Sequence, residues 1–175
     1  MTEKLKTNTL ILIGMTGAGK TTIGKKISYL LKKDFFDSDS EIEKNLGFSI
    51  NQIFEKFGED YFREKEAITI TRILNNYSNI VLSIGGGAFI NKSVRELINQ
   101  KGCSIWLNAN YETIHSRLKN TKNLRPIFKN KDFNKELKEL LNYRKPFYNL
   151  SDIKVDVNNL SINEIVDKII KKFEL

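Results

Sequence analysis

The chain has 175 residues, 40% of them hydrophobic, with a single cysteine and a formal net charge of +8 at pH 7. This length predicts one domain over residues 1–175. The lack of an apolar run of roughly 18 residues excludes a membrane span. The polar start MTEKLKTNT and the lone Cys103 predict a cytoplasmic protein without disulfides. The lysines are scattered rather than clustered, so we expect neither a nucleic-acid partner nor a membrane partner.

Short apolar runs alternate with longer amphipathic segments along the chain. The runs predict strands at residues 9–14, 35–38, 79–85, 103–109 and 153–157, and the longer segments predict helices at 20–33, 49–76, 92–101, 110–120, 134–149 and 161–174. Strands that are almost continuously hydrophobic are typical of a parallel sheet with helices on both faces. Capping boxes, Ser49 to Gln52 and Ser161 to Glu164, mark two helix starts. The pattern therefore predicts one α/β domain.

The first predicted strand leads directly into GMTGAGKT, residues 14–21, which fits the pattern G-x-x-x-x-G-K-[ST]. Its glycines allow the backbone N–H groups to surround an anion, and the following helix contributes the positive end of its dipole. Lys20 is expected to reach the β and γ phosphates, and the Thr21 hydroxyl to face Mg²⁺. The residues predicted to bind a nucleoside triphosphate are Gly14, Gly17, Ala18, Gly19, Lys20, Thr21 and Thr22.

The second predicted strand runs into FFDSDSE, which contains Asp37 and Asp39. In an extended segment these two carboxylates would point the same way. Asp37 is the available carboxylate for Mg²⁺, acting through a bound water because this ion dehydrates reluctantly. Asp39 would orient an attacking hydroxyl and accept its proton. The alternative is a solvated helix start, with Asp39 or Ser40 as N-cap.

The motifs GMTGAGKT, FFDSDSEIE, FEKFGEDYFREKE, IGGG, LRP and YRKPFY occur in the order and spacing seen in shikimate kinases, so the chain resembles that family from about residue 10 to 158. The resemblance implies a three-layer P-loop kinase with a five-stranded parallel sheet in the order 2-3-1-4-5. It also implies a substrate-binding helical region at about residues 39–67 and a lid at about 120–133. By the same resemblance the enzyme is a monomer that uses ATP and Mg²⁺ to phosphorylate the 3-hydroxyl of shikimate, on the route to chorismate and the aromatic amino acids.

Two arginines match the residues with which the family binds the shikimate carboxylate, Arg63 in GEDYFREKE and Arg144 in NYRKPFY. Arginine offers a carboxylate a rigid fork of donors, which lysine does not. Arg63, Arg144 and Arg125 are three of the six arginines in a chain that has 23 lysines. Finding half of the few arginines at motif positions favours a functional placement. The alternatives are ordinary helix pairing of Arg63 with Glu59 and Glu66, and a basic residue in the last turn of a helix for Arg144.

The remaining motifs complete the predicted site. Arg125, in NLRP, matches the lid motif and would contact ATP and stabilise the transferring phosphoryl group as an arginine finger does. Asp39 and Lys20 are the other predicted catalytic residues. Glycines allow a ligand to approach the backbone closely. By the resemblance, shikimate is bound by Asp39, Arg63, Gly85, Gly86, Gly87 and Arg144.

Some assignments stay open at this point. The adenine contacts could come from Arg117 or Lys119, before the lid, or from Asn158 or Asn159, after the last strand. His115 is expected at the surface, and Trp106 and Cys103 in the core. Two other function classes fit part of the sequence: a different small-molecule kinase of the same architecture, acting for instance on a sugar acid or a nucleoside monophosphate, and a noncatalytic ATP-dependent regulator or nucleic-acid binder.

Overall fold

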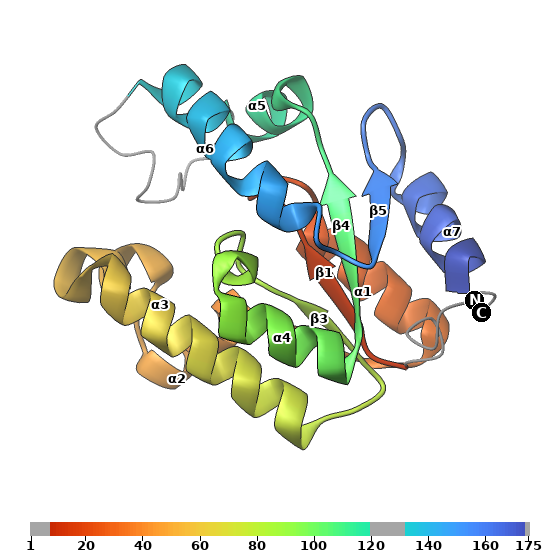
Figure 1. The fold of residues 1–175 in the computed structure, drawn as a ribbon, viewed down its shortest axis with the longest axis horizontal. Helices are drawn as coiled ribbons and strands as arrows, with labels where there is room; N and C mark the ends of the chain where they lie inside the picture. Colours follow the sequence, from red (N-terminus) through yellow and green to blue (C-terminus); the bar gives the residue numbers. More distant parts are fainter. Residues whose placement is uncertain (1–7, 120–131, 174–175) are drawn as a thin grey trace.

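The computed structural model describes residues 8–119 and 132–173, and within them one five-stranded parallel sheet has the order β2-β3-β1-β4-β5 (Figure 1). The α/β class and the strand order implied by the resemblance are therefore confirmed. Each observed strand falls within a predicted one or differs from it by one residue. The strands are β1 (Leu10–Ile13), β2 (Asp34–Asp37), β3 (Ile80–Ser83), β4 (Cys103–Asn108) and β5 (Ile153–Asp156).

Helices cover both faces of the sheet and also gather beyond the carboxyl ends of its strands (Figure 1). One face carries α1 (Lys20–Leu31) and α7 (Ile162–Phe173), and the other carries α3 (Ile50–Asn76) and α4 (Lys92–Lys101). The other helical elements are α2 (Ser38–Leu46), the 3₁₀ turn η2 (Ala88–Ile90), α5 (Tyr111–Lys119) and α6 (Phe133–Tyr148).

The central strand β1 shows how the two cores are divided. Leu10 and Leu12 pack with residues of α1 and α7, whereas Ile11 and Ile13 pack with residues of α3 and α4. All four are buried, as expected for a strand covered on both faces. Burying each such side chain contributes about 1.5–3 kcal/mol relative to exposure, so the sheet is a firm base for the loops at its carboxyl edge.

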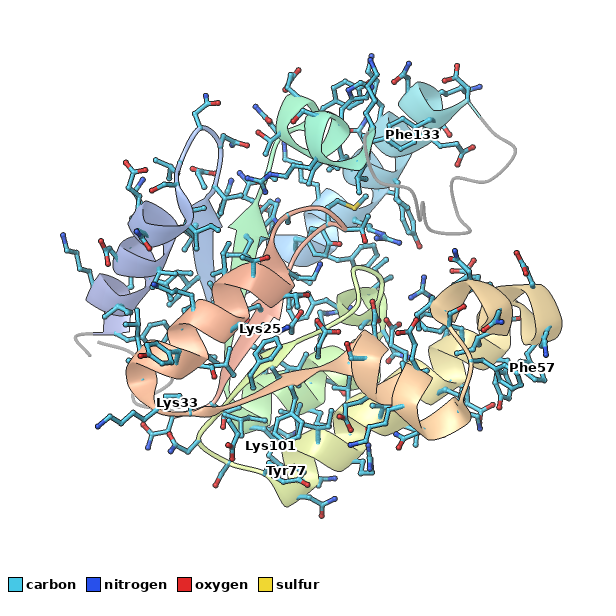
Figure 2. All side chains as sticks on the ribbon, turned by 180° about the vertical axis from the view of Figure 1, so that it is seen from behind. Lys25, Lys33, Phe57, Tyr77, Lys101 and Phe133 are labelled. Carbon is cyan, nitrogen blue, oxygen red and sulfur yellow. The ribbon has the colours of Figure 1, made fainter. Side chains whose placement is uncertain are left out.

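A third, smaller cluster belongs to α2 and the first half of α3. Ile42, Ile53 and Phe62 are fully buried there, while Phe57, at the outer tip of this unit, is 47% exposed (Figure 2). The helix α3 is broken at Gly58, which has φ 84° and ψ 174° and joins two helical pieces. The α2–α3 unit, residues 38–62, is thus a local structure beside the main sheet.

The amphipathic pattern predicted no helix at α2, although the family resemblance implied a helical region at about residues 39–67, and the structure also corrects the expected geometry of the two aspartates. The strand ends at Asp37 and α2 begins at Ser38, so the segment is not extended through Asp39. The Asp37 carboxylate accepts hydrogen bonds from the backbone N–H groups of Asp39 (3.1 Å) and Ser40 (3.4 Å). The helix-start alternative is correct, although the N-cap is Asp37 itself. A carboxylate favours this position because it satisfies helix N–H groups that have no partner within the helix.

Several smaller predictions can be checked directly. Both capping boxes are present, at Ser49 and at Ser161. Cys103 and Trp106 are buried as expected. His115 is half-buried rather than fully at the surface, since its ring lies between those of Tyr111 (5.4 Å between centroids) and Phe133 (5.6 Å).

The predicted lid at about 120–133 lies outside the described residues, apart from Asp132 and Phe133 at the start of α6. Across residues 8–119 and 132–173, no helix is both long and apolar enough to cross a membrane.

Candidate active site

The loop between β1 and α1 folds tightly at the carboxyl edge of the sheet. Gly19, just before α1, has a left-handed backbone (φ 96°, ψ 14°), which glycine adopts without steric cost. Lys20 is only 8% exposed, and its ammonium donates to the carbonyl oxygens of Gly14 (2.9 Å) and Met15 (3.0 Å). A helix N-terminus and a held cation at one loop are suited to binding phosphate.

The phosphate loop and the end of β2 are joined by a side-chain hydrogen bond. The Thr21 hydroxyl donates to Oδ2 of Asp37 at 2.7 Å, while Oδ1 of Asp37 caps α2. A hydroxyl beside a carboxylate supplies the hard oxygen ligands that Mg²⁺ prefers. Within the described residues, no three His, Cys, Asp or Glu side chains gather into a metal-binding cluster. This donor set fits a cation that takes its other ligands from phosphates and water.

These groups line one cavity of about 470 Å³, which Asp39 also lines. Arg117, on α5, lies at its rim and donates to the carbonyl oxygen of Gly17 (3.1 Å). Among the four candidates for adenine contact, Arg117 is therefore placed beside the phosphate loop. Oδ1 of Asn158 instead accepts from the backbone N–H of Asn110 (2.8 Å), which ties the turn after β5 to the start of α5.

The triple-glycine loop, Gly85–Gly87, follows β3 rather than ending it, because β3 stops at Ser83. Each glycine lies against a charged side chain. A methyl group on Gly87 would lie 2.5 Å from Nη1 of Arg63, and one on Gly86 would lie 2.8 Å from Nη1 of Arg144. A methyl group on Gly85 would collide with a carboxylate oxygen of Glu66 and lie 3.0 Å from Oδ1 of Asp39. A methyl group at any of these three positions would therefore push the end of a charged side chain out of place.

Arg63 is held by two glutamates on its own helix. Nη1 of Arg63 lies 2.8 Å from Oε2 of Glu66, and Nη2 lies 2.9 Å from Oε1 of Glu59. Burial opposes the guanidinium charge, but the charge of Glu66 and its hydrogen bond, with smaller contributions from Glu59, outweigh that burial and raise the pKa of Arg63. Helix pairing and placement at the glycine loop thus both hold for this side chain.

Arg144 comes from α6, on the far side of the glycine loop. It is 6% exposed, and its Nη1 lies 3.5 Å from the sulfur of Met15. A basic side chain that only paired with the helix dipole would face solvent, whereas Arg144 points inward. A cavity of about 340 Å³ between α3 and α6 is lined by both arginines together with Gly87.

The structure therefore brings most predicted site residues together around two neighbouring cavities. Lys20, Thr21 and Asp37 line the first, Arg63 and Arg144 line the second, and Asp39 reaches from the first toward Gly85. Arg125 lies outside the described residues.

One charged residue at this site was not among the predicted site residues. Glu66 is 2% exposed and lies against both Arg63 and Gly85. Its spacing of three residues from Arg63 on one helix signalled the ion pair, but no local pattern placed it at the glycine loop.

Comparison with known proteins gives a consistent result. Residues 16–174 match the shikimate kinase family. Shikimate kinases of Francisella philomiragia and Francisella tularensis subsp. novicida are each 40% identical to this chain, over 94% of it and 94% of their own length.

Solved structures agree with these sequence matches. A shikimate kinase from Acinetobacter baumannii in complex with shikimate superposes with a TM-score of 0.89 at 32% identity, covering 97% of this chain and 94% of that one. A gluconokinase from Sinorhizobium meliloti shares the fold at a TM-score of 0.63 and 17% identity, covering 95% of this chain and 91% of that one. The sequence match over nearly the whole chain decides between these neighbours, and the chain belongs to the shikimate kinase family.

Proposed function

We propose that this protein is a shikimate kinase, which transfers the γ-phosphate of ATP to the 3-hydroxyl of shikimate and releases ADP and shikimate 3-phosphate. The observation that carries the proposal is the convergence of Arg63, Arg144 and Asp39 on one glycine loop beside a phosphate cradle. Two guanidinium groups suit a carboxylate, and a single carboxylate suits a hydroxyl. Shikimate carries both groups on one small ring, and family membership supports the same substrate.

On the nucleotide side, the loop from Gly14 to Thr22 would bind the triphosphate. Its backbone N–H groups and the start of α1 favour negative charge. The Lys20 ammonium, which donates to two loop carbonyls, would turn to the β and γ phosphates when these arrive. Arg125 would add its charge to the transferring group, a role proposed from the LRP motif.

Thr21 and Asp37 are the residues that would hold Mg²⁺. When bound, the ion would neutralise charge on the β and γ phosphates. The hydrogen bond between the two side chains keeps the Thr21 hydroxyl and Oδ2 of Asp37 on the same side of the cavity, at 2.7 Å from each other.

On the acceptor side, Arg63 and Arg144 would bind the shikimate carboxylate from opposite walls of their cavity. The Glu59 side chain is 52% exposed and that of Glu66 is 3% exposed. An incoming carboxylate could therefore replace Glu59 on the Arg63 guanidinium, while Glu66 keeps holding it. Arg63 stays charged throughout, because a guanidinium group is always protonated in proteins and Glu66 still pairs with it.

Asp39 would then orient the 3-hydroxyl and accept its proton as the phosphoryl group transfers. It lines the cavity of the phosphate loop and also lies beside Gly85, so it stands between donor and acceptor. Closely held reactants of this kind convert a bimolecular reaction into one within a single complex.

The test is release of ADP from ATP and Mg²⁺ with shikimate as acceptor, run beside gluconate and deoxyadenosine as competing acceptors. We expect shikimate to give the highest kcat/KM, and chelation of the metal to abolish turnover until Mg²⁺ is restored. A Lys20→Ala variant should lose activity, whereas Lys25→Ala, on the exposed side of the same helix, should keep it (Figure 2). No shikimate-dependent ADP above background, or a clear preference for another acceptor, would refute the proposal.

A further inference from the structure

The glycine loop is held through its backbone by two buried hydroxyl groups that the roles above leave unused. The Tyr148 hydroxyl, at the end of α6, donates to the carbonyl oxygen of Gly86. The Ser38 hydroxyl, at the start of α2, accepts the backbone N–H of Gly85 at 3.0 Å. Tyr148 is 3% exposed and Ser38 is 0% exposed. A loop of consecutive glycines has no side chains of its own to pack, so its position depends on contacts of this kind.

Each hydroxyl belongs to an element that also carries a predicted substrate-binding side chain. Tyr148 follows Arg144 by four residues on α6, so the two side chains share a face of the helix. Two side chains of α6 thus reach Gly86: the Tyr148 hydroxyl donates to its carbonyl oxygen, and Nη1 of Arg144 lies 2.8 Å from where a methyl group on Gly86 would stand. Ser38 directly precedes Asp39, whose Oδ1 faces the α-carbon of Gly85.

The tyrosine is itself fixed by the sheet. Its ring packs against that of Trp106 on β4, with 5.7 Å between centroids, and Trp106 is 4% exposed. The indole in turn lies under the phosphate loop, since its Cδ1 is 3.5 Å from where a methyl group on Gly14 would stand. The hydroxyl of Tyr148 therefore connects the glycine loop to the rigid centre of the molecule.

We propose that Tyr148 and Ser38 are positioning residues for the acceptor. Their hydroxyls hold the glycine loop in place against α6 and α2, and this contact orients Arg144 toward the carboxylate and Asp39 toward the reacting hydroxyl of the acceptor. This inference rests on the proposed function, because it assigns a task at the same site. On this assignment each hydroxyl acts on shikimate through the loop and the neighbouring charged side chain, and not by direct contact.

The first test is Tyr148→Phe, which removes one oxygen and keeps the ring. We expect the KM for shikimate to rise about tenfold, the size of effect that a buried hydrogen bond can carry, with kcat and the KM for ATP within about twofold of wild type. The matched control is Tyr29→Phe on α1, where the tyrosine is 80% exposed and all three constants should stay unchanged. A Tyr148→Phe enzyme with a lower Tm but an unaltered KM for shikimate would reduce the hydroxyl to a structural role and overturn the proposal.

A double-mutant cycle with Arg144→Lys tests whether the tyrosine acts through the arginine. If it does, Tyr148→Phe should add little to the KM for shikimate once Arg144 is changed, whereas independent effects would multiply. Full multiplication would contradict the proposed route.

Ser38→Ala is the second, independent variant, and it keeps the proposal testable should Tyr148→Phe fail to fold. Because Ser38 precedes Asp39, we expect its loss to lower kcat about tenfold with the KM for ATP unchanged. Unchanged kcat and KM for shikimate in folded Ser38→Ala would overturn its part. The wild-type enzyme is assayed first. If it does not phosphorylate shikimate, the proposed function is refuted and this inference with it. If the wild type is active and both variants are unaffected, the inference alone is refuted.

Discussion

The two glycine-rich loops at this site need glycine for different reasons. In the phosphate loop, Gly17 and Gly19 have φ values of 80° and 96°, so the backbone conformation itself requires glycine. In the substrate loop, Gly87 has φ −97°, which any residue adopts, and the space beside it is filled by Arg63. The first loop is defined by its own backbone, and the second by the side chains that surround it. A change in the first should alter stability and ATP binding, and a change in the second should alter shikimate binding alone.

The largest effect is expected at Asp39, where the two loops meet. Asp39→Asn keeps the size of the side chain but removes its capacity to accept a proton, so kcat should fall by about 10²- to 10⁴-fold. The KM for ATP should stay nearly constant, because the phosphate loop is intact. Steady-state kinetics with both substrates measures this. Asp34→Asn, at the exposed start of β2, is the control, and an unchanged kcat for Asp39→Asn would remove its role as base.

Gly87→Ala tests the space argument directly. The methyl group would displace the Arg63 guanidinium, and loss of one charge-assisted hydrogen bond to the carboxylate should raise the KM for shikimate by about 10- to 100-fold. The free energy of unfolding should change by no more than about 1 kcal/mol, since alanine is compatible with this φ and restricts the unfolded chain. Urea unfolding and kinetics measure the two quantities. A stability loss without a change in KM would break the comparison.

Gly19→Ala is the counterpart in the phosphate loop. Alanine in a left-handed conformation should lower the free energy of unfolding by about 1–2 kcal/mol and raise the KM for ATP, with a smaller change in the KM for shikimate. Gly47→Ala is the matched control, because Gly47 has φ 70° and nothing within 4 Å of an added methyl group. It should lose similar stability and keep both KM values.

Arg63→Lys tests the same comparison by changing the side chain beside Gly87 in place of the glycine itself. The charge remains, but the rigid fork is lost, so the KM for shikimate should rise about tenfold. Binding of ATP should not change. Lysine also makes room beside Gly87, so Gly87→Ala should have a smaller effect in this background than in wild type. An unaltered KM for shikimate would leave Arg63 with helix pairing only.

The smallest effect is expected at the cap of α7, because Ser161 lines neither of the two site cavities. Ser161→Ala should lower the free energy of unfolding by about 1 kcal/mol and leave both KM values unchanged. The hydrogen bond from the Ser161 hydroxyl is the main cause that lowers the pKa of Glu164 from its ordinary value of 4.5. Because the pKa is lowered by folding, ionised Glu164 stabilises the folded protein at pH values above its unfolded-state pKa. This stabilisation is lost as the pH falls through the folded-state pKa of Glu164. The difference in Tm between variant and wild type should therefore shrink in acid, and a constant difference would argue against the cap.

The two loops also explain what the sequence could and could not reveal. The phosphate loop was found from local spacing, because its conformation depends on its own glycines. The triple glycine gained a role only through the family resemblance, since its neighbours Glu66, Ser38 and Tyr148 come from distant segments. The contact of Tyr148 with Gly86 spans 62 residues and that of Arg117 with Gly17 spans 100.

The amphipathic pattern missed α2 for a related reason. Asp37 can end a strand or cap a helix, and it does both here. A pattern with a period of two therefore extended the strand too far and placed Asp39 on the wrong backbone geometry, although Asp39 still reaches the expected cavity. The strands and the two helices that start with capping boxes were predictable because burial and these caps act within a few residues.

The separate small core of α2 and α3 has a consequence for redesign. Because Ile42, Ile53 and Phe62 pack among themselves rather than into the sheet, the residues around this small core could be changed with little effect on the nucleotide-binding half. Redesign for a new acceptor would start there and keep Asp37 and Ser38 as the junction, since Asp37 is hydrogen-bonded to Thr21 and Ser38 to Gly85.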